Sequence, residues 1–448
     1  MIKDTMNKQL HYRHNVLLYL LLVISGFCYY WLCYETNRQN FLQVFMLFTS
    51  LFAAYYFLIR SWSVSHFQLL LIAGILFRML LLFSVPNLSD DVYRFIWDGR
   101  LMMHGINPYA QLPAEVMQSA SIPGITKELF GQLNSPSYYT IYPPVLQSIF
   151  WLTAKAFPDN IFGTTVCMKV IILLAEAGTI LLLPAILKRL QKPKHFTLLY
   201  TLNPLVIAEL TGNVHFDAIM IFFLVLSFLL LLHNRIYLSA IFLGLSIASK
   251  LFPVLFIPLV MRKLGRTQGL IYSVISGLVT VVLFAFLIDK ETIVHLLKSV
   301  NLFFTSFEFN ACLYYIIRAA GKLLFGMNII AFAGPILSLT AIVIIFLVSR
   351  RDKKISDQQF FTKALLILTV WYLFSTIVHP WYISLPVVVS VFTSYRYPLI
   401  WSYLITLSYS AYQTNPVNEN PALVALSYLL VITYGYLEVR SQRSMRFK

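Results

Sequence analysis

The sequence predicts an all-α polytopic membrane protein, and three observations support this prediction. The chain of 448 residues is 59% hydrophobic and only 12% charged, and its mean hydropathy is +0.74. Apolar runs near the ~20 residues that a helix needs to cross a bilayer recur along the whole length. These runs are continuously apolar, whereas membrane β-strands alternate apolar and polar residues. We therefore expect one integral membrane domain over residues 1–448, with about eleven to fourteen spans.

The basic residues predict which end of the helices faces the cytoplasm. The net charge is +16, and the lysines and arginines cluster in short loops rather than in a patch or stripe. This distribution follows the positive-inside rule and argues against a nucleic-acid partner. The loops predicted to be cytoplasmic are 188–194, 262–266, 350–354 and 440–448. The sequence thus predicts a multi-pass protein of the cell membrane.

The first large outer loop follows three spans, which the hydropathy pattern places near 15–34, 41–59 and 66–85. With a cytoplasmic N-terminus, segment 86–140 lies outside, and a polar loop of this length is usually functional. A short apolar helix is predicted over 142–157, and the next span lies near 166–187. Strict alternation would then place 188–194 outside, against its charge. Either 142–157 does not cross or one early span is wrong, and the sequence leaves this open.

The second half of the chain predicts a broken helix and a second outer loop. The stretch 236–261 contains Lys250 and Pro253, and it is predicted to form two half-helices that turn at Lys250. Segment 289–326 is predicted to lie outside. The remaining spans are predicted near 269–288, 327–349, 361–379, 381–393, 398–412 and 421–437.

The segment from Ser89 to Arg100 holds three acids and two arginines directly after an apolar run. Charge is costly in a chain built for lipid, so this cluster at a membrane edge indicates a working site. Asp91 is the candidate for a general base or a metal-ligating acid, and Asp90 is its fallback. Adjacent carboxylates on a helix point about 100° apart, so only one of them is expected to face the site. The alternative is that Ser89 or Asp90 caps a helix that begins at Val92.

Other titratable residues stand in or beside apolar runs and are candidates for binding the substrate. His215 and Asp217 lie at the outer start of a span, where the acid can orient the histidine or share a proton with it. Lys250 needs an anionic partner or a water path, and a phosphate suits its compact charge. His379 and Tyr382 lie at an outer turn, where the histidine can hold or protonate a phosphate oxygen. The alternatives are a capped helix start, snorkelling of Lys250 and an interfacial aromatic belt.

Seven short motifs follow one another between residues 89 and 382. They are Ser89–Tyr109, Ile141–Pro144, Leu202–Leu205, His215–Ala218, Ser249–Pro253, Phe307–Asn310 and His379–Tyr382. In this order they resemble the motifs of polytopic GT-C glycosyltransferases. They are most similar to those of bacterial mannosyltransferases that use polyprenyl-phosphate sugars. The resemblance implies a GT-C-like helical bundle with a catalytic first outer loop.

The resemblance also implies the reaction and the roles of the residues. It implies an inverting transfer of a sugar, most closely mannose, from a polyprenyl-phosphate donor to a lipid or glycan acceptor at the outer face. The acid that corresponds to the base is Asp91, with Asp90 as fallback. This pair departs from a spaced Asp-x-Asp, which leaves a bridging Mg²⁺ or Mn²⁺ open. Lys250, His379 and Arg94 are the candidates to stabilise the phosphate charge.

Two other classes of membrane protein fit the composition. A flippase or transporter of lipid-linked glycans should spread charge over many spans, whereas here the charges gather at outer positions. An O-antigen ligase or polymerase relies on arginines and histidines in outer loops, and the paired acids point away from that class. No ATP-binding loop accompanies the spans, which argues against ATP-driven transport. The sequence therefore favours a glycosyltransferase, and it leaves the sugar, the acceptor and the oligomeric state open.

Overall fold

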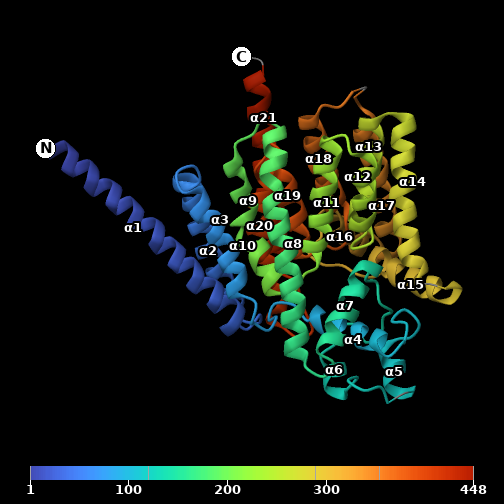
Figure 1. Ribbon diagram of the computed structural model, residues 1–448. Helices are drawn as coiled ribbons and strands as arrows, with labels where there is room; N and C mark the ends of the chain where they lie inside the picture. Colours follow the sequence, from blue (N-terminus) through green and yellow to red (C-terminus); the bar gives the residue numbers. More distant parts are fainter. Residues whose placement is uncertain (1, 120, 288, 353, 447–448) are drawn as a thin grey trace.

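The computed structural model describes residues 2–446 apart from 120, 288 and 353, and its regular elements are helices (Figure 1). Within these residues, extended pairing is limited to an isolated bridge between Phe309 and Ile377. The predicted all-α class is therefore confirmed. In the described part of the chain, six helices are long and apolar enough to cross a membrane, and a bent pair raises the number to seven. Because the other predicted spans coincide with shorter or interrupted helices, the count of eleven to fourteen stays a prediction.

Three helices precede the first large loop. They are α1 (Ile2–Tyr30), which continues as the π-helix η1 (Trp31–Glu35), α2 (Phe41–Trp62) and α3 (Phe67–Leu80). The side chain of Asn40 caps α2 by accepting a hydrogen bond from the N–H of Gln43. The first two helices are long enough to span a bilayer, and α3 is shorter than the predicted span 66–85.

Four short helices gather at one end of the molecule, below the long helices in Figure 1. They are α4 (Asp91–Met103), α5 (Pro113–Ser119), α6 (Lys127–Gly131) and α7 (Pro144–Ala156). At 1.5 Å per residue α7 rises only about 20 Å, which is less than the ~30 Å of a bilayer core. It packs on α4 instead, and Gly99 permits this approach because a Cβ there would clash with the carbonyl oxygen of Phe150. Of the two options for 142–157, the structure favours a helix that does not cross.

The middle of the chain contains two interrupted helices. Its elements are α8 (Ile161–Arg189), η2 (Lys194–Thr197), α9 (Leu198–Thr201), α10 (Pro204–Val206), the π-helix η3 (Ile207–Gly212), α11 (Asp217–Leu232), α12 (Ile236–Ile247), η4 (Phe252–Phe256), α13 (Ile257–Leu264) and α14 (Arg266–Ala285). The chain bends by 117° between the α10–η3 segment and α11. Between α12 and η4 the helix stops around Lys250, so the predicted break there is confirmed.

The last part of the chain supplies the second outer loop and the final helices. They are α15 (Lys290–Thr305), α16 (Leu313–Phe325), α17 (Ile330–Arg350), α18 (Asp357–Phe374), η5 (Pro380–Ile383), α19 (Ser384–Val391), α20 (Tyr397–Leu404), η6 (Ile405–Gln413) and α21 (Pro421–Arg446). The capping boxes of Asp289 and Ser356 fix where α15 and α18 begin.

Three of the predicted basic loops meet at one end of the bundle. Asp357 forms ion pairs with Lys263 at 2.5 Å and with Arg189 at 3.9 Å. Nε of Arg262 donates a hydrogen bond to the carbonyl oxygen of Asp352 at 2.7 Å. The turns after α13 and α17, together with the C-terminus, lie at the end opposite α4–α7 (Figure 1). This arrangement is the one that the positive-inside rule requires if α4–α7 lie outside.

A buried ion pair joins the helices inside the bundle. Nε and Nη2 of Arg78 donate to Oε2 of Glu176 at 3.0 and 2.9 Å, and the Tyr200 hydroxyl donates to the other carboxylate oxygen. Removing one partner leaves an uncompensated buried charge, so Arg78→Leu is expected to destabilise the fold by about 3–5 kcal/mol. Thermal unfolding in detergent measures this loss, and the double variant Arg78→Leu/Glu176→Leu is expected to recover part of it. An unchanged melting temperature of the single variant would contradict the prediction.

Candidate active site

The two adjacent acids at the start of α4 have different partners. Asp90 is the N-cap residue, but its side chain makes no capping hydrogen bond and forms an ion pair with Arg38 at 2.5 Å. Oδ1 of Asp91 accepts a hydrogen bond from Nδ2 of Asn134 at 2.7 Å. The hydroxyl of Ser89 accepts a bond from the N–H of Asp91 at 3.3 Å. Ser89 therefore lies one residue before the N-cap, and no side-chain capping bond occupies either carboxylate.

Arg94 is placed inside the first loop rather than at a ligand site. Its side chain is buried, and Nε donates to Oδ1 of Asp98 at 2.9 Å as the i,i+4 spacing predicts. Nη1 donates to the carbonyl oxygens of Ser135 and Tyr138 at 3.0 and 2.9 Å. These bonds hold the chain that crosses over α4. The structure thus gives Arg94 a role in holding the loop, and the phosphate-binding role suggested for it stays a prediction.

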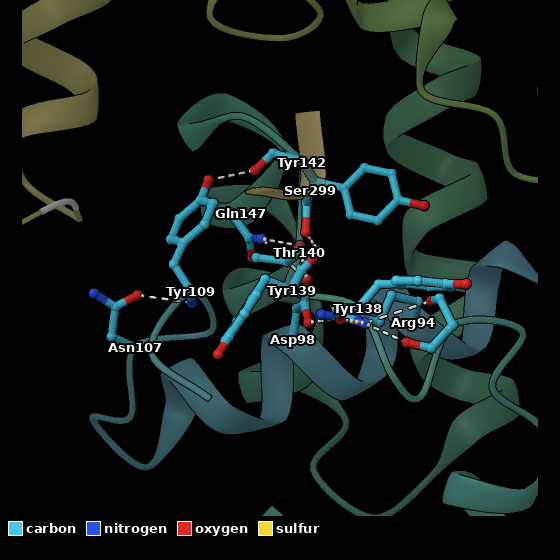
Figure 2. Close-up of polar contacts among 11 residues, drawn as sticks. Arg94, Asp98, Asn107, Tyr109, Tyr138, Tyr139, Thr140, Tyr142, Gln147 and Ser299 are labelled. Carbon is cyan, nitrogen blue, oxygen red and sulfur yellow. Dashed lines mark hydrogen bonds and ion pairs between the residues drawn. The ribbon is translucent and has the colours of Figure 1, made fainter. Parts of the chain in front are cut away.

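Asp98 is the centre of this buried network, as Figure 2 shows. It is fully buried, and its Oδ2 accepts hydrogen bonds from the hydroxyl of Thr140 and from Nε2 of Gln147 at 3.0 Å. A buried carboxylate with one ion-pair partner and two further donors is well satisfied. Asp98 thus fixes the segment 138–142 against α4 and α7.

The second of the two predicted outer loops packs on the first. Nδ1 of His295 in α15 lies 3.0 Å from the carbonyl oxygen of Tyr109, and its ring stacks on Tyr139 at 3.9 Å. The hydroxyl of Ser299 donates to the carbonyl oxygen of Tyr139 at 2.9 Å. The two loops that the sequence predicts on the outer side therefore form one layer.

Lys250 and Asp217 form the charged centre of the site. Nζ of Lys250 lies 2.8 and 2.7 Å from the two carboxylate oxygens of Asp217, and it sits 4.2 Å from the ring centre of Tyr382. The Asp217 side chain is 4% exposed, whereas that of Lys250 is 23% exposed. The ammonium group is therefore held in place by Asp217 and Tyr382, and the Lys250 side chain is only partly buried. The prediction that Asp217 orients His215 is corrected, because its carboxylate pairs with Lys250.

His379 is part of a stack of four rings. The rings follow the order His215, Trp381, His379 and Phe309. The distances between successive ring centres are 3.7, 4.5 and 4.9 Å. Burial, together with His215 and Lys250, lowers the pKa of His379, in the turn between α18 and η5, to about 3. The ring is therefore neutral at physiological pH. The suggestion that it protonates a phosphate is corrected, although a neutral ring can still donate one N–H bond.

Glu209 is a site residue that the sequence analysis did not assign. Its Oε2 lies 3.2 Å from Nε2 of His215, and its Oε1 accepts hydrogen bonds from Asn213 at 3.0 Å and from the hydroxyl of Tyr409. The signal available in the sequence was a carboxylate inside an apolar run, which is costly unless it is paired. Its partner His215 lies in the bend itself, between the end of η3 and the start of α11.

Strained backbone stands at both ends of the ring stack. Val214, directly before His215, has φ of +60°, and Asn310, directly after Phe309, has φ of +46°. A β-branched residue in this region is a real outlier, and such strain of about 1–3 kcal/mol gathers at functional sites. The N–H of Val378 donates to the carbonyl oxygen of Phe309 at 2.9 Å, which holds the loop beside His379. The ends of the stack are thus fixed by the surrounding structure.

The first-loop acid and the Lys250 group are connected through Tyr382. The carboxylate of Asp91 interacts electrostatically with the phenols of Tyr382 and Tyr412, and the Tyr382 ring lies beneath Lys250. Five residues that the sequence singled out lie together through direct contacts and the shared ring of Trp381: Asp217, Lys250, His215, His379 and Tyr382. Within the described part of the chain, no three histidine, cysteine, aspartate or glutamate side chains converge as a metal site requires.

A comparison of the amino-acid sequence with known protein families assigns the chain to one of them. Residues 13–265 match the family described as alpha-(1->6)-mannopyranosyltransferase, N-terminal domain. The match covers more than half of the 448 residues and includes Asp91, Asp217 and Lys250, whereas His379 and Tyr382 lie beyond it. No curated protein matches the chain significantly. The protein therefore belongs to the alpha-(1->6)-mannopyranosyltransferase family, and it is a glycosyltransferase of the mannosyltransferase type.

Proposed function

We propose that the protein transfers mannose from a polyprenyl-phosphate donor to a sugar hydroxyl of a lipid or glycan acceptor, with inversion at the anomeric carbon. The observation that carries this proposal is that the Asp91 carboxylate interacts electrostatically with Tyr382, the ring over which the partly exposed Lys250 is held. A base and a cation gathered around one ring suit a displacement in which both act on one bound substrate. The family description supports mannose and an α-(1→6) product.

Asp91 is the proposed general base. The acceptor hydroxyl gives its proton to the carboxylate as its oxygen bonds to the anomeric carbon. The bond from that carbon to the phosphate oxygen breaks, and polyprenyl phosphate leaves with the electron pair. A positioned carboxylate contributes about 10²–10⁴-fold to such a step. The Asn134 amide, 2.7 Å from Oδ1, holds the carboxylate in one orientation.

Lys250 is the proposed phosphate-binding cation. Negative charge grows on the phosphate as the sugar leaves, and a preorganised cation stabilises this charge. Asp217 fixes the ammonium from the buried side, and Tyr382 lies on another side. We place the neutral His379 beside the phosphate as an N–H donor. The Asp217 carboxylate also offsets the charge of the ammonium, which favours a partly buried lysine.

The outer face is the proposed side of the reaction. The layer of α4–α7 lies opposite the basic loops around Asp357 (Figure 1), and such loops face the cytoplasm in most membrane proteins. A polyprenyl tail would then lie among the apolar helices while its phosphate reaches Lys250. Cysteine labelling of Gln118→Cys and Ser441→Cys, two exposed positions, tests this orientation in intact cells, with only the first expected to react from outside.

Purified protein in nanodiscs with radiolabelled polyprenyl-phosphate mannose and an α-mannoside acceptor tests the reaction. We expect labelled α-(1→6) product from a β-linked donor. A flippase would instead move the labelled lipid between leaflets of proteoliposomes without forming product. Transbilayer movement without transfer would overturn the enzyme assignment in favour of that alternative.

Transfer is expected to continue when divalent cations are removed. The Asp90 carboxylate is paired with Arg38 and that of Asp91 with Asn134, so neither belongs to a ready cation site. The measurement is the initial rate after dialysis against EDTA, compared with untreated protein. A large loss of rate that Mg²⁺ or Mn²⁺ reverses would contradict this prediction.

A further inference from the structure

The backbone of Tyr142 is held close to the break between α12 and η4, where Lys250 lies. Its carbonyl oxygen accepts a hydrogen bond from the Tyr109 hydroxyl, and two prolines follow it in the chain. Their fixed φ angles restrict the backbone at this point. The N–H of Val145 then donates to the carbonyl oxygen of Ala248 at 3.2 Å, two residues before Lys250. The first outer loop is therefore attached to the chain that carries the proposed phosphate-binding lysine.

The ring of Tyr142 is clamped by aromatic side chains. It packs edge to face on Phe95 and on Phe150, with 4.9 and 5.7 Å between the ring centres. Both of these rings also contact Phe216, at 5.3 and 5.2 Å, and Phe216 directly precedes Asp217. Edge-to-face pairs of this kind are favourable beyond the area they bury. The ring is thus fixed at the helix start from which Asp217 reaches Lys250.

The hydroxyl end of Tyr142 is free. Its ring points away from Tyr109 in Figure 2, and no group among the described residues hydrogen-bonds to the hydroxyl, which is not fully buried. Tyr109, Tyr200 and Tyr409, by contrast, all donate to oxygen acceptors. Asp91, Arg94, Asp98 and Tyr382 all interact electrostatically with the Tyr142 phenol. The proposed base and the ring beneath Lys250 are thus among the groups around it.

Burial raises the pKa of Tyr142 well above its usual range, and the Asp91 carboxylate raises it further. The phenol therefore stays protonated and neutral at physiological pH. A neutral phenol is a hydrogen-bond donor, and its most favourable acceptor is an anionic oxygen. Asp91 can be one such acceptor. A phosphate held by Lys250 is another, and it carries the charge that changes during the reaction.

We propose that Tyr142 binds the donor, with its hydroxyl donating a hydrogen bond to a phosphate oxygen of the polyprenyl-phosphate sugar beside Lys250. This inference rests on the proposed function, because that function supplies the lipid phosphate. The clamp explains why a tyrosine is needed here: the ring is held by packing, and only the hydroxyl is available to a ligand.

The variant Tyr142→Phe tests this role because it keeps the ring and removes only the hydroxyl. The probe is tritiated polyprenyl phosphate, which carries no sugar and binds without turnover. We expect its dissociation constant to rise about tenfold or more, since hydrogen bonds to charged groups contribute strongly. The matched control is Tyr138→Phe, a partly exposed tyrosine of the same segment, and its affinity is expected to equal that of the wild type. Melting temperatures of both variants verify folding.

The outcomes separate this inference from the proposed function. Equal affinity of wild type and Tyr142→Phe for polyprenyl phosphate would overturn the role of Tyr142, whatever the transfer assay gives. Binding by the wild type without any transfer of mannose would refute the proposed reaction while still testing Tyr142. If the wild type does not bind polyprenyl phosphate at all, the donor class and the role of Tyr142 both fail.

Discussion

Asp91→Asn is expected to lower kcat by about 10²- to 10⁴-fold, the contribution typical of a positioned general base. Asparagine has almost the same shape as aspartate, but it cannot take the acceptor proton. The structural consequence is small because the new amide oxygen can still accept the hydrogen bond from Nδ2 of Asn134, which lies 2.7 Å from Oδ1. Measured with labelled donor under saturating conditions, the loss should appear in kcat while binding of polyprenyl phosphate is kept.

Asp90→Asn is the matched comparison, since it makes the same chemical change one residue earlier. The Asp90 carboxylate pairs with Arg38 at 2.5 Å and both side chains are partly exposed, so its removal is expected to have a much smaller effect. Full activity of Asp91→Asn together with a large loss in Asp90→Asn would exchange the roles of the two acids. Full activity of both variants would remove the first-loop acids from the chemistry.

Lys250→Met is expected to lower kcat/KM by about 10²- to 10³-fold, as the loss of one preorganised electrostatic group commonly does. The methionine keeps an apolar stem of similar length over Tyr382 and removes the charge that meets the phosphate. It also leaves the buried Asp217 without its partner, which adds a penalty of its own. The measurements are transfer kinetics and the affinity for tritiated polyprenyl phosphate, and both are expected to weaken.

Two controls separate phosphate binding from the loss of the ion pair. The double variant Lys250→Met/Asp217→Asn removes both charges, so it is expected to regain stability without regaining affinity for polyprenyl phosphate. Lys155→Met changes an exposed lysine that lies 5.0 Å from the ring of Trp151, and it is expected to behave as the wild type. Recovery of affinity in the double variant would show that Lys250 serves only to neutralise Asp217.

The sequence by itself determined the class of the molecule, because that depends on local composition and spacing. Long apolar runs require helices in lipid, whatever the rest of the chain does. The break at Lys250 followed from a charge and a nearby proline in an apolar stretch, and the Arg94–Asp98 pair followed from helical spacing. The order of the short motifs pointed to the family, and five of the six residues proposed to bind substrate lie around one region.

Only the tertiary structure decided which of these residues are partners. Asp217 pairs with Lys250, 33 residues away, rather than with His215, two residues away. The chain bends by 117° between η3 and α11, through the strained Val214, and this bend directs His215 to Glu209 and Asp217 to Lys250. The spacing of residues along the sequence does not predict a bend of this kind. The partners of Arg94 were hidden from the sequence for a related reason. Carbonyl groups from a distant part of the loop accept hydrogen bonds from its guanidinium, and such contacts exist only after the loop has folded over α4.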